Sequence, residues 1–250
     1  MPPIDQLKSI VKQLRAPDGC PWDIEQTPQT ITPHIIEEAY ELVDAIERDH
    51  PFDIKDELSD QLLHVVMIAE MMSENNQFNF DDVVNHCCEK MIRRHPHVFG
   101  TESIKSSEEV EKKWEEIKTQ EKPNKSIVDG IPNHLPALLK AQKIQRKVAE
   151  VGFDWPDING PIQKLTEECQ ELIAAVSNDN IDEEIGDILF TIVNICRKLD
   201  KSSEELLQSA NNKFKERFKT CEYIATQHNV KLSSLSIEAL ETLWDQAKKV

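Results

Sequence analysis

This 250-residue chain has few glycines, few tyrosines and no pair of cysteines spaced as Cys-x-x-Cys. Only 6 glycines and 2 tyrosines occur, which disfavours a fold rich in strands and tight turns. The cysteines are Cys20, Cys87, Cys88, Cys169, Cys196 and Cys221. Because none belongs to a metal-binding or redox pair in sequence, we expect them to act as small core residues in a reducing compartment.

The chain also lacks a long apolar run and an excess of basic residues. Its longest apolar stretches, around Leu62–Ala69 and Ile188–Cys196, are far shorter than the roughly 20 residues that span a membrane. The first residues, Met-Pro-Pro-Ile-Asp-Gln, have neither the basic nor the apolar region of a signal peptide. The formal net charge of -17 disfavours nucleic-acid backbones and anionic membranes as partners. We therefore expect a cytoplasmic protein that binds neither nucleic acid nor membrane.

The apolar residues that are present, 39% of the chain, recur mostly at helical spacing and predict an all-α fold. About five helices are expected in each half. In the first half they cover Ile4–Arg15, Pro33–Arg48, Asp53–Asn75, Phe80–Arg93 and Ser107–Gln120. In the second half they cover Leu135–Val151, Pro161–Ser177, Ile181–Leu199, Ser203–His228 and Ile237–Lys248. Four amphipathic helices with short connections suggest a four-helix bundle in each half.

Helix starts are indicated by capping residues. Thr32 before Pro33 has the pattern of an N-cap followed by a first helical residue. Ser106 with Glu109, and Ser202 with Glu205, have the spacing of capping boxes.

An acidic pattern occurs once in each half of the chain. The first half has Glu37, Glu38 and Glu41, then Asp56, Glu57 and Asp60; the second has Glu167, Glu168 and Glu171, then Glu183, Glu184 and Asp187. Residues three and four apart share a helix face, where like charges cost about 0.2–0.5 kcal/mol per pair. A chain that accepts this cost on four segments is expected to hold a cation there. Oxygen ligands at this density suit a hard ion, Mg²⁺ or Mn²⁺, rather than zinc.

Apolar stripes run beside the acids. They are formed by Leu58, Leu62, Val65 and Ala69 in the first half and by Ile185, Leu189, Ile192 and Cys196 in the second. We therefore expect the carboxylates to lie near the interior of each bundle, where they are costly to desolvate without a counter-ion. The simpler alternative is that these acid runs are solvated helix surface. Their occurrence on two helices in both halves argues against it.

The repeat extends beyond the acids. Trp22 precedes the first acidic set and Trp155 the second; Lys90, Arg94, Trp114 and Lys118 follow the first, and Lys213, Arg217, Trp244 and Lys248 the second. Trp155 follows Trp22 by 133 residues and Lys213 follows Lys90 by 123, a drift that changes in loop length would produce. Such a period indicates a tandem domain. The proline-containing stretch from Glu121 to Pro132 reads as a linker, giving domains over 1–121 and 133–250 and a linker over 122–132.

With the acids, the Lys-x-x-x-Arg pair and the Trp-x-x-x-Lys pair in this order, the chain resembles the MazG nucleoside triphosphate pyrophosphohydrolases along essentially its whole length. The resemblance implies tandem all-α domains, Mg²⁺ dependence, hydrolysis of nucleoside triphosphates to monophosphate and pyrophosphate, and dimerisation through the helices. It implies metal ligands at Glu168, Glu171, Glu184 and Asp187, with first-half equivalents Glu38, Glu41, Glu57 and Asp60. It places phosphates on Lys213, Arg217 and Lys248, the nucleoside against Trp244, and nucleotide near Lys164. The first-half equivalents are Lys90, Arg94, Trp114 and Lys118, but His34 replaces Lys164.

The residues support the same chemistry independently. A triphosphate will not approach bare carboxylates, so bridging Mg²⁺ ions are needed, and two such ions can activate water and stabilise a leaving oxygen. Glu37 or Glu167, on the face of the other acids, could orient that water or take its proton, or could only support its neighbours. Tryptophans at positions 114 and 244 are as easily core residues as stacking platforms. We expect the second half to be the better catalyst because it keeps Lys164.

Two other interpretations stay open at this point. The chain could be a non-catalytic acidic helical scaffold or regulatory protein that uses divalent ions for structure. It could also be a di-iron bundle, because His64 follows Asp60 by one turn. However, Thr191 replaces His64 in the second half and no Glu-x-x-His begins within the acidic sets, which disfavours iron. His86 beside Cys87 and Cys88 lacks a second pair at zinc-finger spacing.

Overall fold

The computed structural model of the chain describes residues 1–121, 126–176 and 181–249. The chain divides into two compact units, Met1–Glu121 and Lys122–Val250. All regular elements in the described ranges are helices, so the predicted all-α, tandem organisation is confirmed. The linker over 122–132 stays a prediction, since its first four residues lie outside the described ranges, as does the predicted helix end at Ser177.

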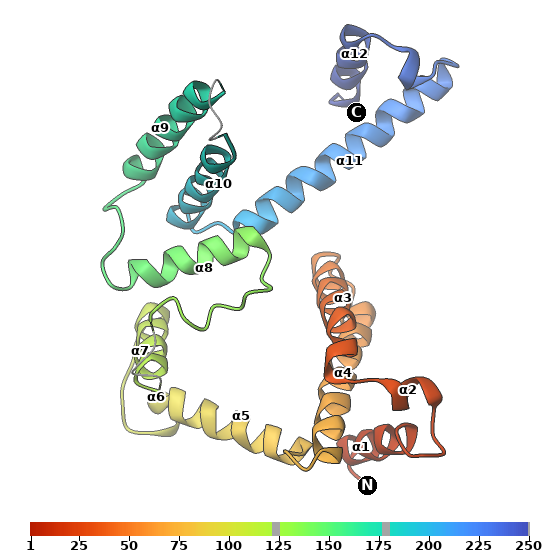
Figure 1. Ribbon diagram of the computed structural model, residues 1–250, viewed down its shortest axis with the longest axis vertical. Coiled ribbons are helices and arrows are strands. Elements are labelled where there is room, and N and C mark those ends of the chain that lie inside the picture. Colours follow the sequence, from red (N-terminus) through yellow and green to blue (C-terminus); the bar gives the residue numbers. More distant parts are fainter. Residues whose placement is uncertain (122–125, 177–180, 250) are drawn as a thin grey trace. The chain divides into compact units, whose positions relative to one another are not determined.

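Unit one is built around a hairpin of two long helices. Its elements are α1 (Pro3–Leu14), α2 (Pro21–Glu25), α3 (Pro28–Glu47), α4 (Pro51–Glu74), α5 (Phe80–Arg94), α6 (Pro96–Phe99) and α7 (Ser107–Gln120) (Figure 1). Helices α3 and α4 form the hairpin, and α1 packs against α4. We call α3 and α4 the acid hairpin of unit one, and α5 to α7 with Glu121 its arm. The core of the unit consists of Val11, Ile31, Val66, Met67 and Met71, all buried.

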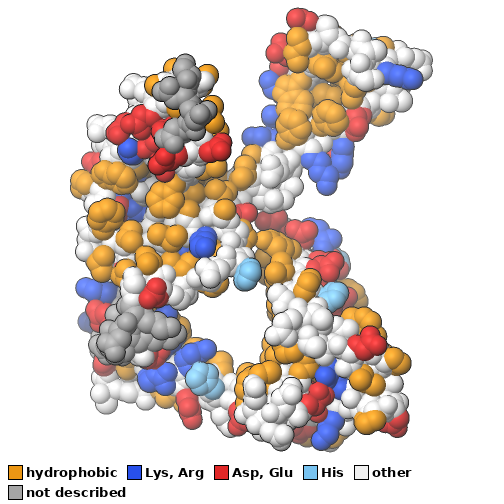
Figure 2. Space-filling model, in the orientation of Figure 1, with side chains coloured by type: hydrophobic (Ala, Val, Ile, Leu, Met, Phe, Trp, Pro, Cys, Tyr) orange, Lys and Arg blue, Asp and Glu red, His pale blue; other side chains and the backbone are white. Residues whose placement is uncertain are grey.

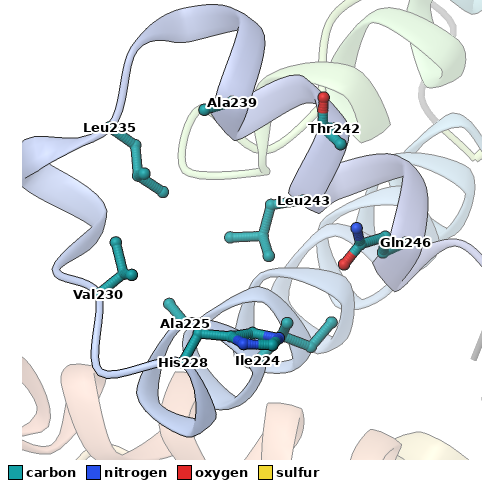
Figure 3. A pocket seen from close by; sticks show the side chains of 9 residues that line it. All are labelled: Ile224, Ala225, His228, Val230, Leu235, Ala239, Thr242, Leu243 and Gln246. Atoms are coloured by element: carbon teal, nitrogen blue, oxygen red, sulfur yellow. The ribbon is translucent and has the colours of Figure 1, made fainter.

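Unit two repeats this arrangement. Its elements are α8 (Ala137–Ala149), α9 (Asn159–Ala175), α10 (Ile181–Lys198), α11 (Ser203–Gln227), the 3₁₀ turn η1 (Leu232–Ser234) and α12 (Ile237–Ala247). Helices α9 and α10 are the acid hairpin of unit two, α8 packs against α10 and α11, and α12 folds back on α11. We call α11 to α12 the arm of unit two. At the corner of this arm, Leu235 and Leu243 face His228 across a pocket of about 330 Å³ (Figure 3).

Ser106 and Ser202 cap helix starts as predicted, but among the described residues neither serine's backbone N–H donates to the glutamate that would complete a capping box. The backbone N–H of Glu109 donates to Ser106 Oγ at 3.2 Å, and that of Glu205 donates to Ser202 Oγ at 3.3 Å. The prediction at Thr32 is wrong: α3 begins at Pro28, one turn and a residue earlier. Thr27 caps it through a reciprocal pair of hydrogen bonds with Thr30.

This correction places Pro33 inside α3 rather than at its first residue. The Thr32 hydroxyl donates to the Pro28 carbonyl at 3.1 Å, as a threonine within a helix does. A Thr-Pro pair is compatible with a helix start, but Thr27-Pro28 is a second such pair and carries the better cap.

The apolar stripes are largely exposed, contrary to the expectation that they lie inside a bundle. Leu58, Leu62 and Val65 are 52%, 42% and 44% exposed, and only Ala69 is buried. In unit two Ile185, Leu189 and Ile192 are also exposed, and Cys196 is half-buried. The reason is that α5 and α11 diverge from the hairpins that they follow instead of packing along them (Figure 1).

The cysteines also differ from expectation. Cys221 is buried, but Cys87, Cys88 and Cys169 are exposed and the other two are half-buried. All six are free thiols. Within the described ranges, no helix combines the length and apolar character that crossing a bilayer requires.

Candidate active site

The second acidic set forms a tight group on α9. Carboxylate oxygens of Glu167, Glu168 and Glu171 lie within 4.8 Å of one another. The side chain of Glu168 is only 3% exposed, and its Oε2 atom has no hydrogen-bond partner in the described structure. Because a buried, half-unpaired carboxylate beside two others is unfavourable, the site fits a cation.

Lys164 already provides one positive charge here. Its ammonium lies 2.7 Å from Glu167 Oε1 and 2.5 Å from Glu168 Oε1, one helical turn away on the same face. Hydrogen bonds to Glu167 and Glu168 raise the pKa of Lys164. Thus the lysine stays charged and holds Glu168 through one oxygen, while Oε2 has no hydrogen-bond partner in the described structure.

Helix α10 brings the remaining acids to this group. Loss of hydration, followed by the charges of Glu171 and Glu168, raises the pKa of Glu184. Glu184 is half-buried and Asp187 is exposed. The predicted ligands of α9 and α10 therefore share one electrostatic site, although Glu184 and Asp187 lie outside the tight α9 group. In Figure 2 acidic side chains gather at this end of the α9–α10 hairpin.

Unit one has an equivalent group, with a different internal balance. Oxygens of Glu38, Glu41 and Glu57 lie within 4.8 Å of one another. The pKa of Glu38 is raised by loss of hydration and by Asp60 and Glu41, and that of Glu57 by loss of hydration and by Glu41 and Glu38.

Histidines take the place of a lysine in unit one. His34 Nδ1 lies 3.7 Å from Glu37 and its ring meets Trp22 edge-on at 6.1 Å. His64 is buried, its Nδ1 has no partner in the described structure, and burial lowers its pKa. His64 does not join the 4.8 Å group of carboxylate oxygens.

The loops that precede the acid hairpins are held in place by packing. A Cβ atom at Gly160 would come within 2.2 Å of the Trp155 ring, so this glycine lets the tryptophan lie on the start of α9. Asp154 pairs with Arg197 at 2.5 Å and Lys198 at 2.7 Å, both at the end of α10. Trp155 is therefore fixed at the entrance to the hairpin.

The basic residues of unit two lie together on its arm. Lys213 is exposed on α11 and Arg217 half-buried one turn later. The Trp244 ring packs against Phe214 with centroids 4.9 Å apart, and Lys248 pairs with Asp245 at 2.9 Å. Within the described ranges, no hydrogen bond or ion pair joins this set to the acid hairpin. The acid group and the basic group of unit two are thus each assembled, but no hydrogen bond or ion pair joins them within the described part of this unit.

The basic residues of unit one are engaged differently. Arg94 lies over Trp114, with its Cζ 5.2 Å from the ring centroid, and bonds Glu121. Lys118 pairs with Glu115 at 2.7 Å, and Lys90 is half-buried one turn before Arg94. Glu121 was not among the site residues predicted from the sequence, where it is only the last residue of the first domain. The signal in the sequence that could have identified Glu121 was its position three residues after Lys118, directly after a predicted helix.

Facing carboxylates on helical hairpins, with basic and aromatic residues on helical arms, are the arrangement that the sequence predicted for an all-α phosphoanhydride hydrolase. A model of the MazG nucleotide pyrophosphohydrolase domain matches residues 26–99 and again 160–222. The chain therefore belongs to the MazG nucleotide pyrophosphohydrolase family, as its motifs predicted.

Full-length relatives agree. The chain is 43% identical to the nucleoside triphosphate pyrophosphohydrolase of Escherichia coli K12 over 98% of its own length and 97% of that protein. It is also 43% identical to the nucleoside triphosphate pyrophosphohydrolase/pyrophosphatase MazG of Thermotoga maritima, over 98% and 95% of the two chains. The uncharacterized protein YabN of Bacillus subtilis is 41% identical over 97% of this chain and 51% of that protein.

Proposed function

We propose that the chain hydrolyses nucleoside triphosphates to nucleoside monophosphates and pyrophosphate, with the second unit as the main catalyst. Its use would be the removal of unwanted triphosphates or the control of nucleotide pools. The observation that carries this proposal is the buried Glu168, which has one oxygen held by Lys164 and the other unpartnered beside two further carboxylates.

Mg²⁺ is the proposed cofactor, and Mn²⁺ is the alternative ion. The donor set fits either ion, because it consists of carboxylate oxygens alone. In unit two Glu168, Glu171, Glu184 and Asp187 would hold it. In unit one Glu38, Glu41, Glu57 and Asp60 would do so. When bound, such an ion supplies an activated water and neutralises phosphate charge.

The side chains of the second unit then have distinct roles in the proposed reaction. Water attacks the α-phosphorus, the bond to the oxygen bridging to the β-phosphate breaks, and pyrophosphate leaves. Glu167, on the face of Glu171, orients the water and accepts its proton. Lys213, Arg217 and Lys248 neutralise the charge of the pyrophosphate, and Trp244 packs against the nucleoside. Lys164 holds Glu167 and Glu168 in position and meets the triphosphate.

We further propose that the chain works as a homodimer in which the arm of one copy meets the acid hairpin of another. Two observations support this. The stripe of Ile185, Leu189 and Ile192 is exposed beside the acids, and Phe214 and Phe218 are exposed beside Lys213 and Arg217. An acidic apolar face and a basic apolar face of one unit are complementary in charge as well as in hydrophobicity.

The product test is direct. Protein incubated with Mg²⁺ and a triphosphate in ¹⁸O-water should release pyrophosphate and a monophosphate that carries the label. Orthophosphate as first product, or label in the pyrophosphate, would place the attack at another phosphorus and contradict the proposal.

The dimer is tested by complementation. Glu184→Ala and Arg217→Ala should each abolish turnover alone. If sites are shared between copies, co-expressed variants should recover about a quarter of the wild-type rate, since half the dimers are mixed and each has one intact site. No recovery, in mixtures that sedimentation shows to be dimeric, would place the acids and the basic residues of each site in one chain.

A further inference from the structure

The guanidinium of Arg94 in unit one is hydrogen-bonded to the carboxylate of Glu121. Its Nη2 donates to Glu121 Oε2 at 2.5 Å and its Nε to Oε1 at 3.3 Å, so the pair is bidentate. Arg93 adds a second guanidinium, with its Nε 2.8 Å from Glu121 Oε1. One carboxylate therefore receives donors from two arginines, the arrangement with which proteins commonly hold a phosphate.

This ion pair is more than a contact between solvated surface charges. The side chain of Arg94 is 14% exposed and that of Glu121 is 21% exposed. The guanidinium of Arg94 also lies over the Trp114 ring. The His95 ring contacts the same tryptophan edge-on, with the two ring centroids 5.0 Å apart. Hydrogen bonds from Arg94 and then Arg93 lower the pKa of Glu121 to about 2, so the carboxylate remains ionised at any physiological pH.

The corresponding arginine of unit two is not held in this way. Arg217 occupies the position that Arg94 has in the repeat, but no ion pair or hydrogen bond to it is present in the ranges that the structure describes. Its tryptophan, Trp244, packs against Phe214 instead of under the guanidinium. The two repeats thus carry the same basic and aromatic residues in two different states.

We propose that Glu121 occupies the position of a phosphate in unit one, so that this half excludes nucleoside triphosphates and the chain binds one nucleotide, in unit two. The proposal rests on the function proposed above. The ligand that Glu121 excludes is a polyphosphate anion. The guanidinium groups of Arg93 and Arg94 can bind either the phosphate oxygens or the carboxylate oxygens of Glu121, but not both. Binding in unit one requires displacement of a partner that is covalently part of the same arm.

The stoichiometry of binding tests this proposal. The probe is an α,β-methylene nucleoside triphosphate with Mg²⁺, measured by calorimetry and equilibrium dialysis on the full chain. Wild type should bind one molecule per chain. Glu121→Gln should bind two, with affinity at the new site raised at least about 10-fold over the wild-type first unit, since charge-assisted hydrogen bonds become available. Adding Arg94→Ala to Glu121→Gln should restore one.

The matched control is Glu111→Gln, which removes the same charge from an exposed position of α7 and should leave one site. Glu121→Ala gives the same readout should the glutamine variant melt early. Two molecules bound to wild type, one bound to both Glu121 variants, or two bound to Glu111→Gln would each overturn the proposal. A failure of the proposed function would be seen in a different measurement, because the wild-type protein would then release no pyrophosphate.

Discussion

Replacing Glu168 by glutamine is expected to remove both turnover and the response of unit two to Mg²⁺. The change keeps the size of the side chain and removes one charge at a site that is 3% exposed, where no solvent can replace it. The unpartnered Oε2 is the atom that the proposal assigns to the ion. A neutral amide in its place is a poor ligand and leaves Glu167 as the one carboxylate that pairs with Lys164.

The size of the effect follows from the number of ligands. If the ion binds about 100-fold more weakly, an Mg²⁺ concentration of 100 times the wild-type dissociation constant stabilises wild type by about 2.7 kcal/mol, but the variant by only about 0.4 kcal/mol. At about 2–4 °C per kcal/mol, the thermal shift of unit two falls from roughly 5–10 °C to roughly 1 °C. We expect kcat/KM to fall at least about 1000-fold, or about 4 kcal/mol.

Thermal melting with and without Mg²⁺ and steady-state release of pyrophosphate measure the two quantities. The matched control is Glu222→Gln, which removes an exposed carboxylate from α11. It should behave as wild type in both assays. A Glu168→Gln enzyme within about 10-fold of the wild-type kcat/KM would refute the assignment of this carboxylate to the ion.

Three further predictions follow from the sites. Glu184→Ala should abolish turnover, whereas Glu57→Ala should keep most of it. The reverse order of steady-state rates would show that the catalytic role belongs to unit one. Because loss of hydration and neighbouring acids raise the pKa of Glu184, its charge opposes folding increasingly as pH rises from about 4.5 through that raised pKa. With a chelator present, the melting temperature of Glu184→Gln should therefore be a few degrees above that of wild type at pH 7 and equal to it near pH 4. Equal melting temperatures at both pH values would contradict this prediction. Trp244→Ala should raise KM about 10-fold with kcat nearly unchanged, and an unchanged KM would show that the ring only packs on Phe214.

The sequence predicted the helices and the acid clusters well because both depend on local periodicity. Acids three and four residues apart necessarily share a face, and two short-looped helices necessarily pair, so the grouping of Glu168 with Glu171 required no knowledge of tertiary structure. The start of α3 was missed because two Thr-Pro pairs compete and local rules do not rank Thr27 against Thr32.

What the sequence could not supply depends on distant packing. The stripe of Leu58, Leu62 and Val65 has the spacing of a core, yet spacing cannot say whether the covering surface belongs to the same chain. Likewise, Glu121 follows the last helix of unit one in a stretch with little periodicity. Only the fold of the arm brings it to Arg93 and Arg94.

The two acid hairpins differ in what neutralises their carboxylates before any ion arrives. In unit one the carboxylates of Glu38 and Glu57 lie together, and loss of hydration and neighbouring acids raise the pKa of both. In unit two the ammonium of Lys164 pairs with Glu167 and Glu168 and offsets part of their charge. The hairpin of unit two therefore begins with one internal positive charge that the hairpin of unit one lacks.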